Sequence, residues 1–327
     1  MIITKTPFRI SFIGGGTDFK NYFKFYGGAV ITTSINKYMY IVAKRQHGII
    51  EYKYKLHWRK TEFKNKISEI EHPIVREALR LFKINFPIEI SSYADVPAST
   101  GLGSSSSFAV GLVNALSNLL KLNLSKNKIS SIAAKIEVDI LKRKIGFQDH
   151  YSTAFGNFNK ITFKKKNIRV NKVPISKSNL KKLEKNLLLV YTNKKRDSSK
   201  ILKNQFKPDN LQLKNLHNIK AQIKIFEDNL KKKNVNINKL SEIINKQWRI
   251  KKKISKKINT KAIDSILKDS MRLGAYGGKL LGAGGGGFIL LLASKKSQNK
   301  IKNHFGSENI LEFNFEAEGT CVIYNGT

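Results

Sequence analysis

The chain has 327 residues, 41% of them hydrophobic, so it can bury a core, and its length predicts two globular domains. Lysine and arginine number 61 against 23 acidic residues, and the formal net charge of +38 will attract anions such as nucleotides, sugar phosphates, nucleic acid or acidic membrane. The single cysteine, Cys321, excludes an intrachain disulfide, and no apolar run is long enough to span a membrane.

The positive charge is spread along the chain, and asparagine and isoleucine are abundant as well. This pattern indicates a bias in composition rather than a dedicated nucleic-acid function, although a basic surface would still steer anionic substrates inward. The six histidines are scattered without CxxC or HxxxH spacing, so zinc is not expected. The N-terminal sequence shows no targeting pattern, which, together with the lone cysteine, favours a cytoplasmic protein.

The N-terminal part of the chain is rich in strand patterns. Residues 2–13 alternate in polarity and contain many β-branched side chains, which predicts a strand, and residues 28–45, 49–55 and 87–93 have the same character. Between them, apolar residues at helical spacing predict a helix over 72–82.

The middle of the chain alternates between loops and helices. A loop over 95–103 is predicted to lead into a long apolar helix at about 105–120, and a second helix is predicted over 129–141. The stretch 146–159 contains two glycines and is predicted to be rich in loops, whereas 159–170 returns to strand-like sequence.

The C-terminal half combines lysine-rich helical patterns with a few apolar strands. Because strands and helices mix without regular βαβ alternation, the sequence predicts the α+β class. The lysine- and serine-rich stretch 175–186 is the expected boundary between domains at 1–180 and 181–327. The elements expected beyond it are strands at 187–191, 287–293, 309–315 and 319–324, and helices at 208–230, 238–255, 259–272 and 295–304.

The segment Pro97–Ser107, PASTGLGSSSS, has the properties of a phosphate-binding loop. Gly101 and Gly103 allow backbone angles closed to other residues, so successive N–H groups can point at one anion. The helix that follows adds its positive N-terminal end, and a serine hydroxyl can ligate Mg²⁺. A flexible linker is the alternative, but a linker would not run straight into the most apolar helix of the chain. The predicted phosphate-binding residues are Pro97, Thr100, Gly101, Leu102, Gly103, Ser104, Ser105, Ser106 and Ser107.

Two other nucleotide-binding motifs are excluded by their context. A GxxxxGK[ST] run is absent, because Gly278-Lys279 is followed by a leucine. A GxGxxG spacing occurs at Gly282, Gly284 and Gly287, but an apolar strand pattern follows it where a dinucleotide-binding motif requires a helix.

Three segments, in the same order, resemble the GHMP kinase superfamily. They are Thr6–Asp18, Pro97–Ser107 and Lys279–Phe288, and together they span most of the chain. The resemblance implies a two-domain fold, with an N-terminal βαβ-type nucleotide domain and a C-terminal ferredoxin-like α/β sandwich. It also implies phosphoryl transfer from ATP, with Mg²⁺ as cofactor, to an alcohol group of a small molecule.

The resemblance also assigns residues to the site. Ser105 looks like the serine that ligates Mg²⁺, and Glu137, on a later helix, completes the metal site. Asp149 matches the catalytic aspartate that accepts or orients the proton of the attacking hydroxyl, and Arg9 matches the cation beside it. From the residues alone, Glu137 reads as a solvent-facing helix residue and Asp149 as a helix cap. His150, next in sequence, is not expected to take part.

The run Gly14–Asp18, GGGTD, is similar to that of the branch which phosphorylates the anomeric hydroxyl of D-glycero-α-D-manno-heptose 7-phosphate, and Gln148-Asp149 and residues 71–76 resemble this branch as well. Fucokinase-like members are the nearest alternative. A phosphorylated sugar needs a second anion site, and Arg196 matches the family's arginine there, although a surface cation is a serious alternative in so basic a chain. The residues implied in substrate binding are Gly15, Gly16, Thr17, Asp18, Arg196, Gly284 and Gly285.

The prediction is therefore an ATP-dependent sugar kinase whose partners are a sugar phosphate and ATP, with no nucleic acid and no membrane. Its oligomeric state stays open, with a homodimer as one option. The alternative from another class is a basic nucleic-acid-binding protein, suggested by the net charge and by the aromatic residues in Tyr52–Arg59, YKYKLHWR. A scaffold without catalysis is disfavoured because Ser105, Glu137 and Asp149 are all present.

Overall fold

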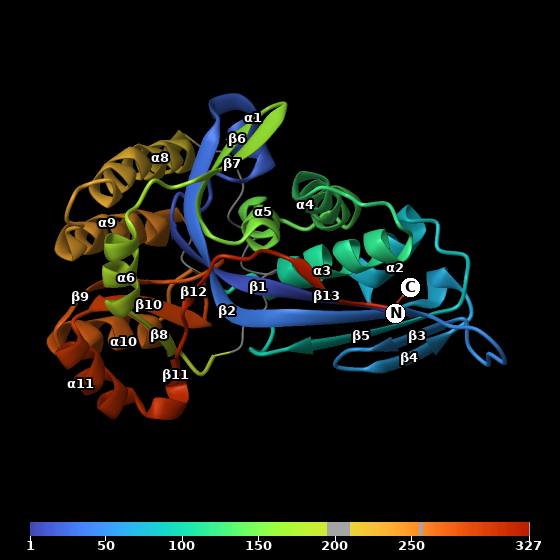
Figure 1. Cartoon of the computed structure of the whole chain (residues 1–327). Coiled ribbons are helices and arrows are strands. Elements are labelled where there is room, and N and C mark those ends of the chain that lie inside the picture. Colours follow the sequence, from blue (N-terminus) through green and yellow to red (C-terminus); the bar gives the residue numbers. More distant parts are fainter. Residues whose placement is uncertain (195–209, 255–257, 327) are drawn as a thin grey trace.

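The computed structural model describes residues 1–194, 210–254 and 258–326, which form two sheets with helices packed against them (Figure 1). Within the described residues, the larger sheet has nine strands and the smaller has four. Both sheets consist mainly of antiparallel pairs, and helices lie between and beside them. The α+β class predicted from the sequence is confirmed.

The larger sheet is built around two long strands, β1 (Ile2–Ile13) and β2 (Gly28–Arg45), which pair antiparallel along almost all of β1. Side chains such as Ile10, Phe12 and Ile31 are fully buried, as expected for β-branched and aromatic residues at the centre of a sheet. The other strands of this sheet are β3 (Tyr54–His57), β4 (Thr61–Lys64), β5 (Ile88–Ala94), β6 (Phe158–Lys164), β7 (Asn167–Lys172), β12 (Phe315–Glu316) and β13 (Cys321–Asn325).

The strand predicted over 49–55 is wrong for most of its length. The side chain of Ile49 is fully exposed, and regular pairing begins only at Tyr54, which lies opposite Ile88 in the parallel β3–β5 pair. Because β5 offers main-chain partners only from its own first residue, the preceding segment cannot join the sheet.

Helix α3 (Ser104–Leu119) packs on β1 and β2 and is enclosed by α4 (Lys126–Ala134) and α5 (Gln148–Phe155) (Figure 1). Every residue from Ser106 to Ser117 is buried, so the long apolar helix predicted at 105–120 is confirmed. The other helices of this half are α1 (Lys20–Tyr26), α2 (Pro73–Leu81) and a short 3₁₀ turn at Ile67–Glu69.

Two predictions in this region are corrected by the structure. The stretch 146–159, expected to be rich in loops, contains α5, whose sequence QDHYSTAF has little apolar pattern. Its residues His150–Ala154 are nevertheless buried against α3 and α4, and this burial stabilises the helix. The helix predicted over 129–141 becomes a π-helix at Lys135–Ile140, a form often found at functional sites.

The smaller sheet has the strand order β11–β8–β10–β9. Its strand β9 (Ala275–Leu280) was not predicted, because the two glycines in AYGGKL weaken the strand pattern. A Cβ on Gly277 would lie within 3.0 Å of Asn245 and one on Gly278 within 3.0 Å of Leu291, so these glycines allow close packing. The other strands are β8 (Leu187–Tyr191), β10 (Phe288–Ala293) and β11 (Ile310–Leu311).

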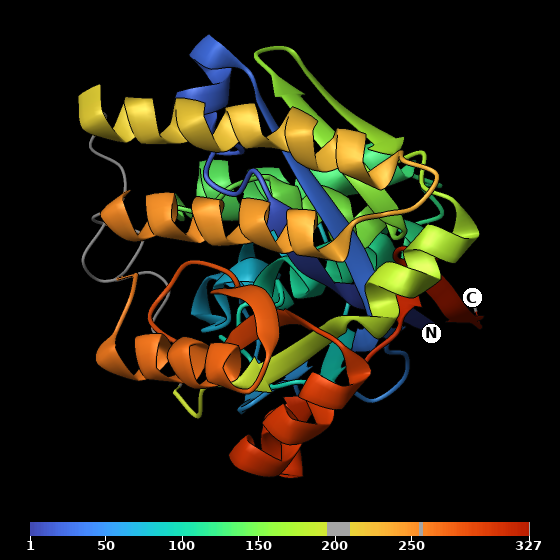
Figure 2. The same ribbon diagram turned by 90° about the vertical axis from the view of Figure 1, so that its left-hand side faces the viewer.

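The lysine-rich helices pack on this second sheet, on the first sheet or on both. Figure 2 shows α8 (Asn210–Leu230), α9 (Ile237–Ile254) and α10 (Lys261–Arg272) lying side by side, and α8 and α9 also contact β1. The ring centroids of Phe12 and Phe226 are 6.0 Å apart, so α8 extends the core between the sheets. The remaining elements are α6 (Lys177–Lys185), α11 (Lys295–Phe305) and a 3₁₀ turn at Ser307–Asn309.

The C-terminal strands return to the first sheet. Strand β13 pairs with β1 and β12 pairs with β2, so the two termini lie together (Figure 1), and the N–H of Gly326 donates to the carbonyl of Met1 at 2.8 Å. The division into domains at 1–180 and 181–327 stays a prediction.

The glycine-rich turn between β9 and β10 packs directly on the loop Pro97–Ser107. The N–H of Phe288 donates to the carbonyl of Thr100 at 2.9 Å. Gly287 has φ +105°, and a Cβ there would lie 2.3 Å from the same carbonyl oxygen. Only a residue without a side chain therefore lets the second sheet approach the loop so closely.

Substituting Gly287→Ala should lower the free energy of unfolding by about 1–3 kcal/mol more than Gly48→Ala, because alanine would overlap the Thr100 carbonyl. Gly48 is a matched control, since it also has a positive φ of +87° but no atom within 4 Å of its Cβ position. Urea denaturation of both variants measures this difference. An equal loss of unfolding free energy in the two variants would show that the close approach does not require a glycine at position 287.

Candidate active site

The loop Pro97–Ser107 joins β5 to α3, and its backbone turns through left-handed conformations. Ser99, Gly101 and Gly103 have φ values of 67°, 89° and 83°. Gly103 precedes the first turn of α3, and no side chain caps that turn. The N–H groups at the start of this helix thus remain directed at the loop, where an anion would sit.

The hydroxyl side chains of the loop fall into two groups. Thr100 donates to the carbonyl of Pro97 at 3.0 Å, and Ser107 donates to the carbonyl of Pro7 at 3.1 Å, so both hold the loop in shape. Ser104 is half-buried and Ser105 is exposed at the start of the helix. The loop therefore has an inner, structural side and an outer side that is open to a ligand.

Arg9 and Asp149 form a bidentate ion pair next to this loop. Arg9 Nε and Nη2 donate to the two carboxylate oxygens of Asp149 at 2.7 and 2.6 Å. Arg9 Nη1 donates to the carbonyl of Gly101 at 2.7 Å, and a Cβ on Gly103 would lie 3.3 Å from the Arg9 side chain. The side chain of Arg9 is only 4% exposed and that of Asp149 is 22% exposed, so the carboxylate can meet a substrate while the guanidinium stays inside.

The second carboxylate, Glu137, is fully buried and lies on the π-helix. Ser105 Oγ and Arg143 Nη1 both contact its Oε1 at 2.6 Å. Ser106 Oγ donates to its Oε2 at 3.1 Å, and His150 Nε2 contacts the same atom at 2.8 Å. Burial alone would raise the pKa of Glu137, but His150, Arg143 and Ser105 together lower it to about 2.

This arrangement fits a nucleotide-borne Mg²⁺. Within the described residues, no group of three or more histidine, cysteine or acidic side chains is placed to hold a metal. Mg²⁺ commonly takes only one or two protein oxygens and completes its shell with phosphates and water. The ionised carboxylate of Glu137 and the hydroxyl of Ser105, 2.6 Å apart at the phosphate loop, supply such a pair.

The predicted substrate-binding turn Gly14–Asp18 lies beside Asp149. The Asp18 carboxylate is fully buried and accepts from the N–H groups of Gly16 at 2.9 Å and Gln148 at 3.2 Å. Burial raises the pKa of Asp18, and the main-chain donors only partly offset it. A Cβ on Gly146 would lie 1.8 Å from the Asp18 carboxylate, so the glycine before α5 keeps room for it.

Three other residues predicted in the substrate site contact main-chain atoms of neighbouring segments. The Thr17 hydroxyl donates to the carbonyls of Gly14 and Ala29, both at 2.8 Å, and so fixes the turn. Gly284 and Gly285 pack on the backbone of Ile258: a Cβ on Gly284 would meet Ile258 Cα at 2.7 Å.

Gly15 and Arg196 are the remaining predicted substrate residues. Gly15 lies near the Gln148 side chain, whose Oε1 accepts from Ser11 Oγ at 2.8 Å. Arg196 lies outside the described residues.

Sequence reasoning missed two members of the Glu137 cluster, Arg143 and His150. From the sequence, His150 is not expected to take part. Adjacent helix residues point in different directions, and His150 contacts Glu137 whereas Asp149 contacts Arg9. Arg143 lies on the segment between the π-helix and α5, with no pattern to single it out in a lysine-rich chain. His150 reaches Glu137 from α5, whereas Arg143, six residues after Glu137, also contacts Ser105 at the start of α3.

Comparison with known proteins identifies the family. Residues 73–157 match the GHMP kinases N terminal domain, and residues 227–310 match the GHMP kinases C terminal. The D-glycero-alpha-D-manno-heptose 7-phosphate kinase of Campylobacter jejuni is 31% identical over an alignment of 339 positions, which covers 97% of each chain. The chain belongs to the GHMP kinase family.

Two further proteins of related name resemble this GHMP kinase. The galactokinase of Pyrococcus furiosus is 23% identical over 97% of this chain and 96% of its own. The crystal structure of a D-glycero-D-manno-heptose 1-phosphate kinase from Bacteroides thetaiotaomicron matches with a TM-score of 0.80 over 100% of both chains at 23% identity, which supports the fold. The protein is thus a sugar kinase that uses ATP, a phosphotransferase with an alcohol group as acceptor.

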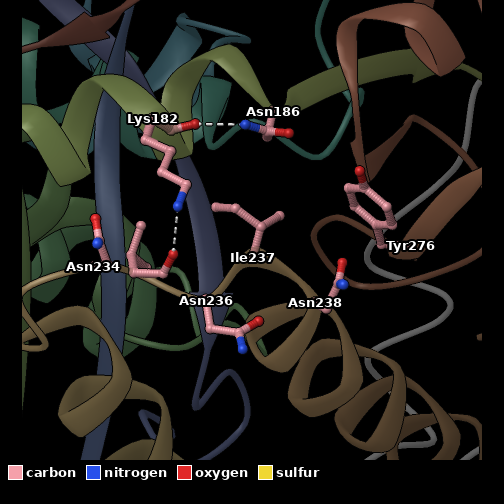
Figure 3. A pocket seen from close by; sticks show the side chains of 8 residues that line it. Lys182, Asn186, Asn234, Asn236, Ile237, Asn238 and Tyr276 are labelled. Carbon is pink, nitrogen blue, oxygen red and sulfur yellow. Dashed lines mark hydrogen bonds between the residues drawn. The ribbon is translucent and has the colours of Figure 1, made fainter.

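The GHMP kinase also has a separate shallow pocket of about 430 Å³ between α6, the start of α9 and β9 (Figure 3). Its lysine is already engaged, since Lys182 Nζ donates to the carbonyl of Val235 at 3.0 Å. None of the predicted site residues that the structure describes lines it. The side chains drawn around it are Lys182, Asn186, Asn234, Val235, Asn236, Ile237, Asn238 and Tyr276.

The low pKa of Glu137 predicts a specific acid sensitivity. The folded state keeps this carboxylate ionised down to a pKa of about 2, against 4.5 for the free side chain, so the unfolded chain takes up the proton first as pH falls. The free energy of unfolding should therefore fall between about pH 5 and pH 2 more steeply in the wild type than in Glu137→Gln. Urea denaturation across this range, with the exposed Glu242→Gln as control, measures the difference; parallel curves for Glu137→Gln and wild type would contradict it.

Proposed function

We propose that this GHMP kinase transfers the γ-phosphoryl group of ATP to the anomeric hydroxyl of D-glycero-α-D-manno-heptose 7-phosphate. The product would be the 1,7-bisphosphate, on the route to GDP-heptose and surface polysaccharide. The observation that carries the chemistry is the Arg9–Asp149 pair beside the phosphate loop. The choice of sugar is supported by the GGGTD turn at Gly14–Asp18 and by the 31% identity to a kinase of that name.

The proposed reaction is a direct displacement at phosphorus. The substrate hydroxyl oxygen forms a bond to the γ-phosphorus, the bond from the γ-phosphorus to the bridging oxygen breaks, and ADP leaves. Asp149 orients the hydroxyl and takes its proton. Because both Asp149 oxygens are already hydrogen-bonded to Arg9, the carboxylate is held in one orientation for this role.

At the nucleotide end, the N–H groups of the loop and of the first turn of α3 would bind the phosphates. Ser105 and Glu137 would hold Mg²⁺, which, when bound, offsets the negative charge of the phosphates. Glu137 suits this role because it is ionised and fixed by its neighbours before any ligand arrives.

The sugar end rests on the turn Gly14–Asp18 and on Arg196, which we propose as the ligand of the distal phosphate. A fucokinase-like or other sugar 1-kinase activity is the alternative within the same family.

We place the enzyme in the cytoplasm, where its single thiol would stay reduced. Within the described residues, none of the helices is long and apolar enough to cross a membrane.

The structure of Tyr52–Arg59, the segment that suggested nucleic-acid binding, argues against that alternative. Of the residues in Tyr52–Arg59, Tyr54 and Leu56 belong to the core, and Trp58 Nε1 donates to Glu62 Oε1 at 2.9 Å. These side chains are buried or hydrogen-bonded within the protein, so they do not form an exposed surface on which bases could stack.

A panel of acceptors assayed with ATP tests the substrate: heptose 7-phosphate, fucose, galactose, N-acetylhexosamines and mevalonate. We expect the highest kcat/KM for heptose 7-phosphate, and Arg196→Gln should raise KM for this sugar without affecting non-phosphorylated sugars. A preference for a non-phosphorylated sugar would overturn both the heptose assignment and the role of Arg196.

Asp149→Asn should lower kcat by roughly 10²–10⁴-fold, since it removes the proton acceptor but keeps the shape of the side chain. Asp139→Asn is a matched control, because the Asp139 side chain is 40% exposed and paired with Lys20 at 2.6 Å. Steady-state assays with unchanged unfolding midpoints measure the effect. Near-normal turnover by Asp149→Asn would reject the mechanism.

A further inference from the structure

The carboxylate of Glu137 has its acceptor sites filled. An ionised carboxylate offers about four lone-pair positions on its two oxygens. Oε1 is contacted by Ser105 Oγ and Arg143 Nη1, both at 2.6 Å. Oε2 is contacted by Ser106 Oγ at 3.1 Å and His150 Nε2 at 2.8 Å. A divalent ion that takes Glu137 as a ligand must therefore displace a donor.

Arg143 is the neighbour best placed to leave. Its side chain is 34% exposed and lies between the π-helix and α5, whereas Ser106 and His150 are buried within α3 and α5. Arg143 Nη1 also donates to Ser105 Oγ at 2.7 Å. One nitrogen thus bridges the hydroxyl and the carboxylate oxygen that are the proposed ligands of Mg²⁺.

We propose that Arg143 is a resident cation that holds Ser105 and Glu137 in the nucleotide-free enzyme and is exchanged for the divalent ion when the metal–nucleotide complex binds. This inference rests on the Mg²⁺ role proposed for Ser105 and Glu137. The exchange keeps the buried carboxylate paired with positive charge in both states, which matters because an unpaired buried charge is strongly destabilising.

The released guanidinium of Arg143 would find new partners, the phosphates of the nucleotide, close to Ser105. Ser105 stands at the exposed start of α3, so Arg143 leaves its partners at the mouth of the phosphate loop. The planar fork of arginine suits phosphate oxygens. A bare metal ion would displace Arg143 without offering it a partner, whereas a metal–nucleotide complex brings the phosphates along. Arg143 therefore couples the binding of metal to the binding of nucleotide.

Binding of Mn²⁺ to the full-length protein without nucleotide, followed by electron paramagnetic resonance, tests the exchange. Arg143→Gln removes the resident cation, and we expect Mn²⁺ to bind about tenfold more tightly than to the wild type. Lys142→Gln removes the same charge from the exposed neighbouring residue and should leave the affinity within about twofold of wild type.

Equal Mn²⁺ affinity in Arg143→Gln and wild type would overturn the exchange, as would equal tightening in Lys142→Gln, which would reduce the effect to long-range charge. Adding Glu137→Gln to Arg143→Gln should abolish the gained Mn²⁺ binding. If binding persists there, the metal role of Glu137 in the proposed function fails as well. Should Arg143→Gln not fold, Arg143→Lys, which keeps the charge on a side chain one atom shorter, should tighten Mn²⁺ binding by a smaller factor, and no tightening would again overturn the exchange.

Discussion

The guanidinium of Arg9 connects three parts of the chain that are distant in sequence. It extends from β1, donates to the carbonyl of Gly101 in the phosphate loop and binds both oxygens of Asp149 on α5. A buried cation is tolerated only when it is paired and its hydrogen bonds are satisfied. One side chain therefore joins the loop backbone to α5, and the proposed catalytic carboxylate is oriented by the same residue that contacts the proposed phosphate-binding loop.

Two fully buried carboxylates near this pair differ in their electrostatics. Burial raises the pKa of Asp18, which has main-chain N–H groups as partners and Asp149 as a charged neighbour. Glu137 is buried to the same degree, but His150 and Arg143 lower its pKa. At Glu137 the side-chain contacts of His150, Arg143 and Ser105 outweigh the cost of burial, whereas at Asp18 the main-chain N–H groups offset it only in part. This difference makes Glu137, rather than Asp18, the carboxylate suited to a metal ion.

The second sheet contributes to the site through backbone proximity. Gly287 lets the carbonyl of Thr100 approach, and Lys279 Nζ, fully inside the protein, donates to the carbonyl of Phe12 at 2.6 Å. Burial, together with the cations of Lys251 and Arg9, lowers the pKa of Lys279. These contacts join β9 and the glycine-rich turn to β1 and the phosphate loop, so the two sheets pack as one core around the site.

The sequence by itself determined the class of the fold, most of the long strands and helices, and the residues that carry the family motifs. Its signals are local: periodic burial marks β1, β2 and α3, and the glycine–serine run marks the phosphate loop. It failed at α5 and β9, because the polar residues of α5 and the glycines of β9 take their places only through packing against other elements. Only the tertiary structure decided that His150 and Arg143 meet Glu137, since contacts over 13 and 6 residues, across the π-helix and the irregular segment that follows it, leave no periodic trace in the chain.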